Sequence, residues 1–138
     1  MLSQLIVITA LLWAGMILGI SFLESWVKFR APTLTKAIGL DVGRTVFNSF
    51  HKVQCILLMG IILISIFIKL TLINWQIVGM LIIIFILQLA WLFPTLNQRV
   101  NAILAGEKPQ NSHAHKVYGI FEIAKFLILV DFSMRLMF

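Results

Sequence analysis

The stretch that decides the fold is HAHKVYGIFEIAKFLILVDF, residues 113–132, near the end of the chain. It is apolar enough to form a membrane helix, yet it carries Glu122 and Lys125 near its middle. Ionisable groups in a span cost about 2.5 to 3.5 kcal/mol each on insertion scales, and they normally face the interior of a helical bundle. The stretch therefore predicts a helix that packs against others around a shared polar interior.

The composition is typical of a polytopic membrane protein. Of the 138 residues, 61% are hydrophobic and only 12% are charged, and the mean hydropathy is +1.04. Soluble domains are about one quarter charged. A helix needs about 20 mostly apolar residues to cross a bilayer, and the chain contains four such segments with little between them. We therefore expect an all-α fold, a polytopic bundle of four transmembrane helices without a soluble domain.

Breaking and capping residues predict where the four helices end. Pro32 should stop the first helix, because a proline disfavours helical geometry in the residue before it, and Asp41 is a good N-cap for the second. Gly106 should end the third helix, and Asn111 or Ser112 should cap the fourth. The N-terminal stretch lacks the features of a cleaved secretory signal, so we interpret it as a retained helix. A single domain, residues 1–138, is thus divided into helices at about 5–29, 41–69, 75–105 and 113–135.

Lysine and arginine are distributed unevenly among the connections. The first connection holds five and the third holds three, so these two hold eight in total, whereas the second holds only Lys69. The positive-inside rule places the first and third connections in the cytoplasm and both termini outside. Trp26, Trp75 and Trp91 fall near the two proposed interfaces, as an aromatic belt predicts, and Trp13 does not fit. We expect an integral protein of a bacterial inner (plasma) membrane, N-out and C-out.

Polar residues form a stripe at the cytoplasmic end of each predicted helix, because residues seven and eleven apart lie nearly above one another on an α-helix. If the last helix enters the membrane near Val117, Lys125 lies about 12 Å deeper, too far for easy snorkelling. Lys125 therefore needs a partner inside. The candidate ligand-binding residues on these stripes are Glu24, Lys28, Arg44, Asn48, His51, Arg99, His115, Tyr118, Glu122 and Lys125, and the stripes also include Ser21, Gln88 and Thr95.

Two interpretations of these stripes are open. In the first they are structural: Glu122 and Lys125 pair at i,i+3, and Lys28 snorkels to the surface. In the second they surround a cavity that binds a ligand. The stripes contain four cations against two carboxylates, and such an excess suits a small anion or a lipid headgroup.

The sequence shows no metal or cofactor motif. His113 and His115 diverge by about 200° around a helix, so they would meet one ion only in an extended segment. Cys55 has no partner for a disulfide within the chain. The net charge of +6 comes from basic residues beside apolar spans, so we expect membrane lipids and not nucleic acid as partners.

Two GxxxG motifs bear on helix packing. Gly15 and Gly19 lie within the first helix, where this spacing permits close helix contact. We expect that motif to serve packing within the bundle, with a homo-oligomer as the alternative. Gly39 and Gly43 precede the predicted second helix, so we interpret them as turn residues.

The order of several short motifs resembles a known group of small membrane proteins. LLWAGMILGISF is followed by VKFRAPTLTKAIGLDVGRTVF and then by HKVYGIFEIAKFLIL. This layout is similar to the transmembrane-protein-205-like group, which shares a tryptophan-glycine first helix, a glycine-bearing link and a histidine entering the fourth helix. The resemblance covers most of the chain. It implies a four-helix membrane bundle with no established activity, so no site residue transfers from it.

Two classes of function remain. The first is a small integral membrane binding or transport protein, or an accessory subunit, whose cytoplasmic-facing polar cavity accepts a small anion, a lipid headgroup or a partner helix. The second is a membrane-embedded enzyme that uses Glu24 or Glu122 as acid or base with His51 as its partner. Nothing in the chain resembles a nucleophile held by a base and an orienting group, so the first class is favoured.

Overall fold

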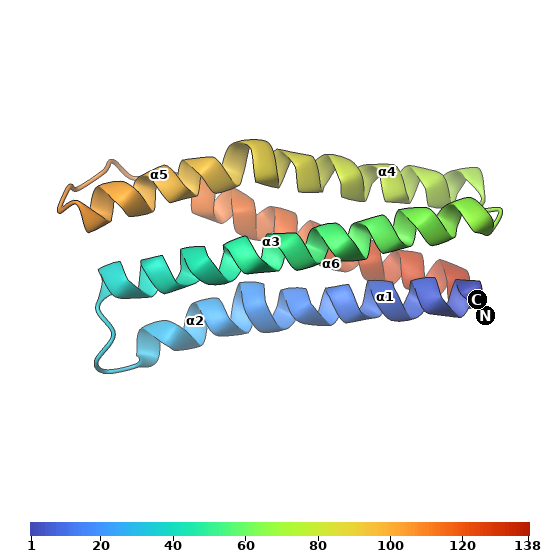
Figure 1. The fold of residues 1–138 in the computed structure, drawn as a ribbon, viewed down its shortest axis with the longest axis horizontal. Helices are drawn as coiled ribbons and strands as arrows, with labels where there is room; N and C mark the ends of the chain where they lie inside the picture. Colours follow the sequence, from blue (N-terminus) through green and yellow to red (C-terminus); the bar gives the residue numbers. More distant parts are fainter.

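The computed structural model describes all 138 residues as four long helices joined by short connections, with no strand. Figure 1 shows the helices side by side and antiparallel, with both termini at the end where the second helix turns into the third. The all-α fold is therefore confirmed. The first helix (Leu2–Arg30) comprises α1 (Leu2–Met16), η1 (Ile17–Glu24), α2 (Ser25–Val27) and η2 (Lys28–Arg30). The second helix is α3 (Lys36–Phe67), and the fourth is α6 (Ala114–Met137). The third helix (Leu72–Leu104) comprises α4 (Leu72–Leu87), η3 (Gln88–Leu92) and α5 (Phe93–Leu104).

The first connection shows where capping was predicted correctly and where it was not. The helix ends before Pro32, and Ala31 is extended with ψ 121°, as a residue before proline should be. The prediction that Asp41 caps the second helix is wrong. Thr35 is extended and accepts a hydrogen bond from the Ile38 N–H at 3.3 Å, so α3 begins five residues earlier than Asp41. Asp41 instead lies within α3 and pairs with Arg44.

The other helix ends follow the same rules of capping. Gly106 ends α5 with φ +81°, and the N–H groups of Gly106 and Glu107 donate to the carbonyls of Ile103 and Ala102, which is a Schellman motif. The prediction for Gly106 is confirmed. Ser112 accepts the Ala114 N–H at the start of α6, and Thr71 caps α4 by accepting the Asn74 N–H, so the third helix begins before Trp75.

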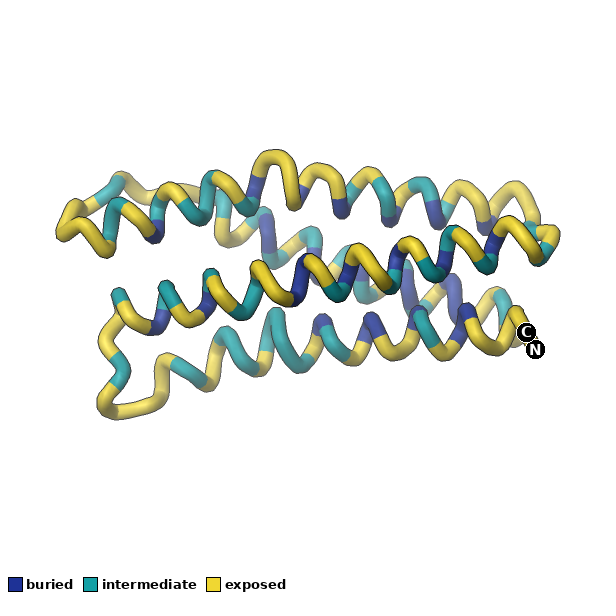
Figure 2. The backbone as a smooth tube through the Cα atoms, viewed as in Figure 1, coloured by how far each residue is buried: buried dark blue, intermediate teal, exposed yellow.

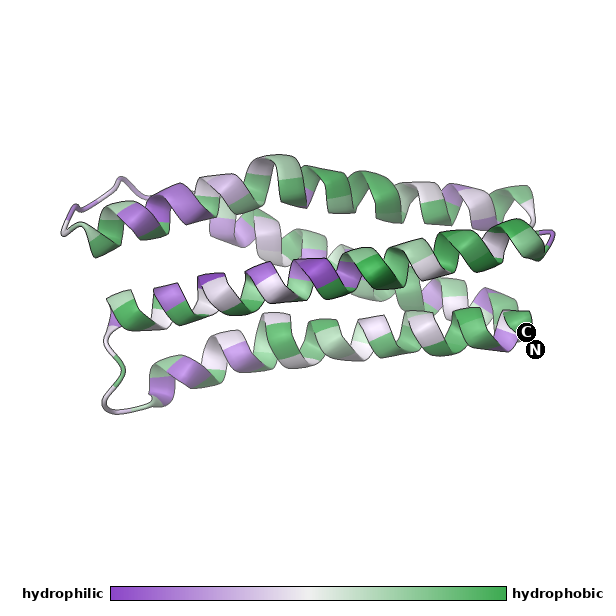
Figure 3. Ribbon diagram, in the orientation of Figure 1, coloured by the Kyte–Doolittle hydropathy of each residue, from purple (hydrophilic) through white to green (hydrophobic).

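Three of the four helices, Leu2–Arg30, Lys36–Phe67 and Leu72–Leu104, are long and apolar enough to cross a membrane. Their exposed positions are largely hydrophobic, as a comparison of Figures 2 and 3 shows along the middle of the bundle. Phe67 is 76% exposed and Ile56 is 69% exposed. Such an exterior suits lipid and not water, so the chain is an integral membrane protein. The fourth helix, α6, carries five charged residues along its 24 positions.

The helices form a square in which α3 and α6 lie at opposite corners. The helix α6 packs against α1 and α4, and α3 packs against α1 and α5. The end of the bundle that holds the termini has a dry apolar core, with the side chains of Ile6, Ile61, Leu81, Leu129 and Phe132 fully buried. Ser65, Asn74 and Ser133 are the buried polar residues at this end, and the buried charged side chains lie beyond the core, toward the first and third connections.

Both interpretations of the GxxxG motifs are corrected by the structure. Gly39 and Gly43 lie in α3, not in a loop, and both are buried against the end of the first helix. A Cβ on Gly39 would meet the Phe29 ring at 2.5 Å, and one on Gly43 would meet the Lys28 ammonium. These glycines therefore form a notch for Lys28 and Phe29. Around Gly15 and Gly19 no atom lies near an added Cβ, so that motif does not pack within the bundle.

Two π-helical segments interrupt the first and third helices. They are η1 and η3, and both contact α6. The second precedes Pro94, whose ring cannot fit an unbroken α-helix and whose nitrogen donates no hydrogen bond. The wider π-turns let the helix continue through the proline, which explains why residues 72–104 form one continuous helix.

Gly39→Ala should destabilise the protein relative to Gly60→Ala. Both changes gain the same helix propensity within α3, but only the Cβ at position 39 collides with the Phe29 ring, and such overpacking costs about 1–3 kcal/mol. The measurement is thermal unfolding in detergent, with Gly60→Ala as the matched control because nothing lies within 4 Å of its Cβ. Equal melting temperatures for the two variants would contradict the notch.

Candidate functional site

A polar cluster lies fully buried in the middle of the bundle, centred on α6. Lys125 Nζ lies 2.6 Å from Glu122 Oε1, and neither side chain is exposed. The Glu122 carboxylate also accepts hydrogen bonds from Ser21 Oγ at 2.6 Å and Gln88 Nε2 at 2.8 Å. Ser21 lies in η1 and Gln88 begins η3, so both π-helical segments supply a donor to the same carboxylate.

The second half of the cluster joins Lys125 to α3 and α1. Lys125 donates to Gln54 Oε1, and the Trp13 indole N–H donates to the same oxygen at 3.2 Å. This contact explains why Trp13 lies in the middle of a helix and not at an interface. The Lys125 ammonium is also 5.8 Å from the centres of the Trp13 and Phe85 rings, within reach of a cation–π attraction. Side chains from all four helices thus meet in this cluster.

A histidine–tyrosine pair lies between this cluster and the first and third connections. Tyr118 Oη and His51 Nε2 form a hydrogen bond of 2.8 Å, and His51 packs against Phe93 with ring centres 4.5 Å apart. Both side chains are buried. Three polar atoms near this level have no partner in the protein: His51 Nδ1, Gln54 Nε2 and Gln88 Oε1.

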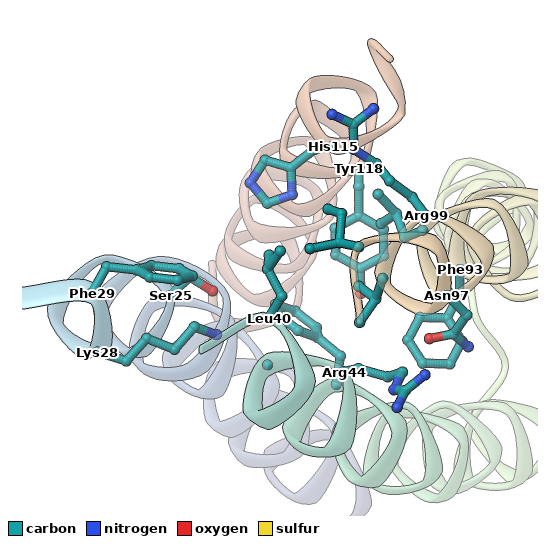
Figure 4. Close-up of a pocket in the computed structure, with 15 residues that line it drawn as sticks. Ser25, Lys28, Phe29, Leu40, Arg44, Phe93, Asn97, Arg99, His115 and Tyr118 are labelled. Carbon is teal, nitrogen blue, oxygen red and sulfur yellow. The ribbon is translucent and has the colours of Figure 1, made fainter. Parts of the chain in front are cut away.

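On the other side of the pair, a cavity of about 200 Å³ opens among the ends of the four helices nearest the connections. Figure 4 shows its walls: Ser25, Lys28 and Phe29 from the first helix, Leu40 and Arg44 from α3, Phe93, Asn97 and Arg99 from the third helix, and His115 and Tyr118 from α6. Eight of the fifteen lining residues are hydrophobic. The cavity is larger than an engineered apolar cavity of about 150 Å³ that holds benzene, so it can accept a group of at least that size.

The charges on the cavity wall are all of one sign. Lys28, Arg44 and Arg99 line it, His115 adds an imidazole, and no carboxylate is among the lining residues. Each cation is oriented by a partner that does not line the cavity. Lys28 pairs with Glu24 at 3.3 Å, Arg44 pairs with Asp41 and Asn101, and Arg99 donates to the Gln110 carbonyl at 2.6 Å. Lysine carries three N–H donors and arginine five, so donors remain for a ligand.

The predicted site residues therefore fall into two places. Glu122 and Lys125 form the buried cluster, and His51 lies beside it. Lys28, Arg44, Arg99, His115 and Tyr118 line the cavity, Glu24 lies beside it as the partner of Lys28, and Asn48 is exposed in a neighbouring groove. The helices do share a polar interior at Glu122 and Lys125, but the cavity is a separate space, and the Tyr118–His51 pair lies between the two.

Sequence reasoning missed several polar residues of these sites. Gln54 joins Lys125 to Trp13, and it lies three residues after His51, a spacing that puts both on one face of a helix. Asn97 and Asn101 are i,i+4 on α5 and face α3. These spacings are the signals by which all three could have been found. No three His, Cys, Asp or Glu side chains gather as a metal site would require.

Lys125→Met and Glu122→Gln should each lower the free energy of unfolding by about 3–5 kcal/mol, because each leaves a fully buried group without its partner. The double variant should cost less than the sum of the two, because it leaves no unpaired charge. A double-mutant cycle from unfolding in detergent measures the coupling.

The matched control is the pair Asp131 and Arg135 on the same helix, 2.7 Å apart and half exposed. Asp131→Asn with Arg135→Gln should show a coupling below about 1 kcal/mol. If Lys125→Met and Glu122→Gln are as stable as the parent and show no coupling, the buried pair does not hold the bundle together.

Comparisons with protein-family models, curated proteins and solved structures found no match to this chain. The similarity to the transmembrane-protein-205-like group thus stays an expectation from the short motifs in the sequence. The geometry and charge of the cavity are therefore the basis for assigning a function.

Proposed function

We propose that this protein is a four-span membrane protein that binds an anionic group in the cavity at its cytoplasmic end. The group belongs to a membrane lipid or to a small soluble anion. In this proposal α6 is the fourth span, and its charges are tolerated because Lys125 and Glu122 neutralise each other inside the bundle. The first and third connections face the cytoplasm of an inner membrane, and both termini face outside.

The main observation behind the proposal is that every charged side chain in the cavity wall is a cation. Three permanent cations and a histidine surround a space with no carboxylate among its lining residues. Glu24 and Asp41 balance Lys28 and Arg44 from outside the cavity, whereas Arg99 has only a neutral partner, the Gln110 carbonyl, so one positive charge at the wall is left for an anion. A phosphate or carboxylate supplies that balance and accepts charge-assisted hydrogen bonds from lysine and arginine.

The depth of the cavity favours a headgroup as the source of the anion. Trp26 and Trp91 are exposed and neighbour the lining residues Ser25 and Phe93 in sequence. Exposed tryptophans mark the headgroup level of a membrane. Arg30 stacks on the Trp26 ring, with its guanidinium carbon 3.6 Å from the ring centre, which adds a further cation at this level.

The enzyme hypothesis lacks a comparable observation. Glu122 already binds three donors and is fully buried, and Glu24 pairs with Lys28. The nearest polar partner of His51 is the hydroxyl of Tyr118 and not a carboxylate. Binding is therefore the function that these contacts support best.

Phosphatidic acid should bind the parent protein more tightly than phosphatidylcholine does, and Arg99→Gln should weaken that binding about tenfold or more. The reason is that the variant removes a charge-assisted donor from the cavity wall. The measurement is lipid binding to the protein in a neutral detergent, followed by native mass spectrometry. Arg135→Gln, at the opposite end of the bundle, is the control and should keep the parent affinity. Equal retention of both lipids by the parent, together with no binding of inorganic phosphate, would overturn the proposal.

The proposed orientation can be tested with single cysteines in a Cys55→Ser background, since Cys55 is exposed on α3. An impermeant thiol reagent added outside intact cells should label Ser3→Cys and Leu72→Cys, because the N-terminus and the second connection face outward. It should not label Thr33→Cys in the first connection until the membrane is opened. The opposite labelling pattern would reverse the orientation.

A further inference from the structure

A second hollow adjoins the cavity on the outer side of the bundle, between α3 and α5. This groove has a volume of about 340 Å³ and is lined by six residues, of which only Phe93 is hydrophobic: Arg44, Thr45, Asn48, Phe93, Asn97 and Asn101. Exposed side chains near this end of the bundle are often polar, as Ser49, Lys52 and Gln98 are, but these asparagine and threonine side chains come together from two helices. Their convergence from two helices therefore needs an explanation.

The groove and the cavity share a wall. Arg44, Phe93 and Asn97 line both. Arg44 is held in this wall by Asp41 and Asn101, which orient its guanidinium between the two spaces. A ligand whose anionic group lies in the cavity can therefore extend past Arg44 into the groove without leaving the protein.

The groove offers uncharged side chains that can both donate and accept hydrogen bonds. A carboxamide carries two N–H donors and an acceptor oxygen, and a hydroxyl group both donates and accepts. The hydrogen bonds within the groove join Arg44 to Asn101 and the Thr45 hydroxyl to the Asp41 carbonyl, which leaves the amides of Asn48 and Asn97 for a ligand. Such a surface complements a group with several hydroxyls, and the nearby guanidinium opposes a cationic group such as choline or ethanolamine.

From this juxtaposition we infer the class of ligand: a phosphate ester of a polyol, with its phosphate in the cavity and its hydroxyls in the groove. This inference rests on the proposed function and deepens it. The same chemistry occurs in a lipid with a glycerol headgroup and in free glycerol phosphate, so the experiment includes both.

The test compares two lipids of equal charge in phosphatidylcholine nanodiscs that contain the full-length protein. Phosphatidylglycerol and phosphatidylethanol are both singly charged phosphodiesters, and only the first carries hydroxyls. The parent should bind phosphatidylglycerol about tenfold more tightly, as expected from one or two net hydrogen bonds. Asn48→Ala combined with Asn97→Ala should abolish that preference. Asn48→Ala alone changes a residue that lines the groove and not the cavity, so it should weaken the preference and leave the affinity for phosphatidylethanol unchanged.

Gln98→Ala is the matched control, because Gln98 is an exposed amide on α5 that lines neither space. It should keep the preference for phosphatidylglycerol. Free glycerol phosphate is added in a separate arm. If it competes with the lipid at similar affinity, a soluble compound is a ligand; if it does not compete, the ligand is the lipid. Both results support the polyol phosphate class.

Three outcomes count against the inference, and they are distinguishable. Equal affinity of the parent for the two anionic lipids overturns the polyol assignment and leaves the proposed anion site intact. A preference that survives the asparagine changes shows that the groove is not its source. Binding of neither anionic lipid above phosphatidylcholine, together with no binding of free glycerol phosphate, overturns the proposed function together with this inference.

Discussion

The ion pair of Lys125 and Glu122 is the interaction on which the rest of the bundle depends. Both groups are completely buried, and each has hydrogen-bond partners on other helices. Between membrane helices the hydrophobic effect gives little selectivity, because lipid tails are as apolar as leucine, so polar contacts and close packing determine which helices meet. Since Ser21, Gln54 and Gln88 come from the three other helices, this pair specifies the position of α6 relative to all of them.

The same pair divides the molecule into two halves with different properties. Toward the termini the interior is formed mainly by buried apolar side chains. Toward the first and third connections the two π-helical segments begin, and beyond them the bundle encloses the cavity. A π-turn shifts the register of every later residue, so it changes which side chains face inward. The segments η1 and η3 therefore bring donors to Glu122 and also mark the level at which the bundle opens.

Much of the fold was predictable from the sequence, and the errors have local physical causes. Hydropathy and breaking residues predicted the four helices, and the i,i+3 spacing predicted that Glu122 meets Lys125. The i,i+4 spacing of Glu24 and Lys28 likewise brings these two side chains together, 3.3 Å apart. The start of α3 was misplaced because Asp41 and Thr35 both suit an N-cap, and only the packing of Gly39 and Gly43 against the first helix selects Thr35.

The candidate site was less predictable, because it depends on which helices are neighbours. The cations of the cavity could be found as stripes, and their number suggested an anion. That Lys125 belongs to a different, neutral site required the depth of each residue and the Tyr118–His51 pair between them. The groove could not be found at all from single helices, since Asn48 and Asn97 form a common surface only when α3 lies beside α5.

This division also bears on whether the protein binds its ligand or transports it. An anion that left the cavity toward the termini would have to pass the Tyr118–His51 pair, the neutral ion pair and then an interior of fully buried apolar side chains. Beyond the ion pair the interior is mostly apolar and offers few hydrogen bonds, and an unpaired charge in such surroundings is strongly disfavoured. The cavity lies at the connection end of the bundle and shares Arg44, Phe93 and Asn97 with the groove between α3 and α5. This arrangement favours a site that captures a headgroup from one leaflet over a pathway through the bundle.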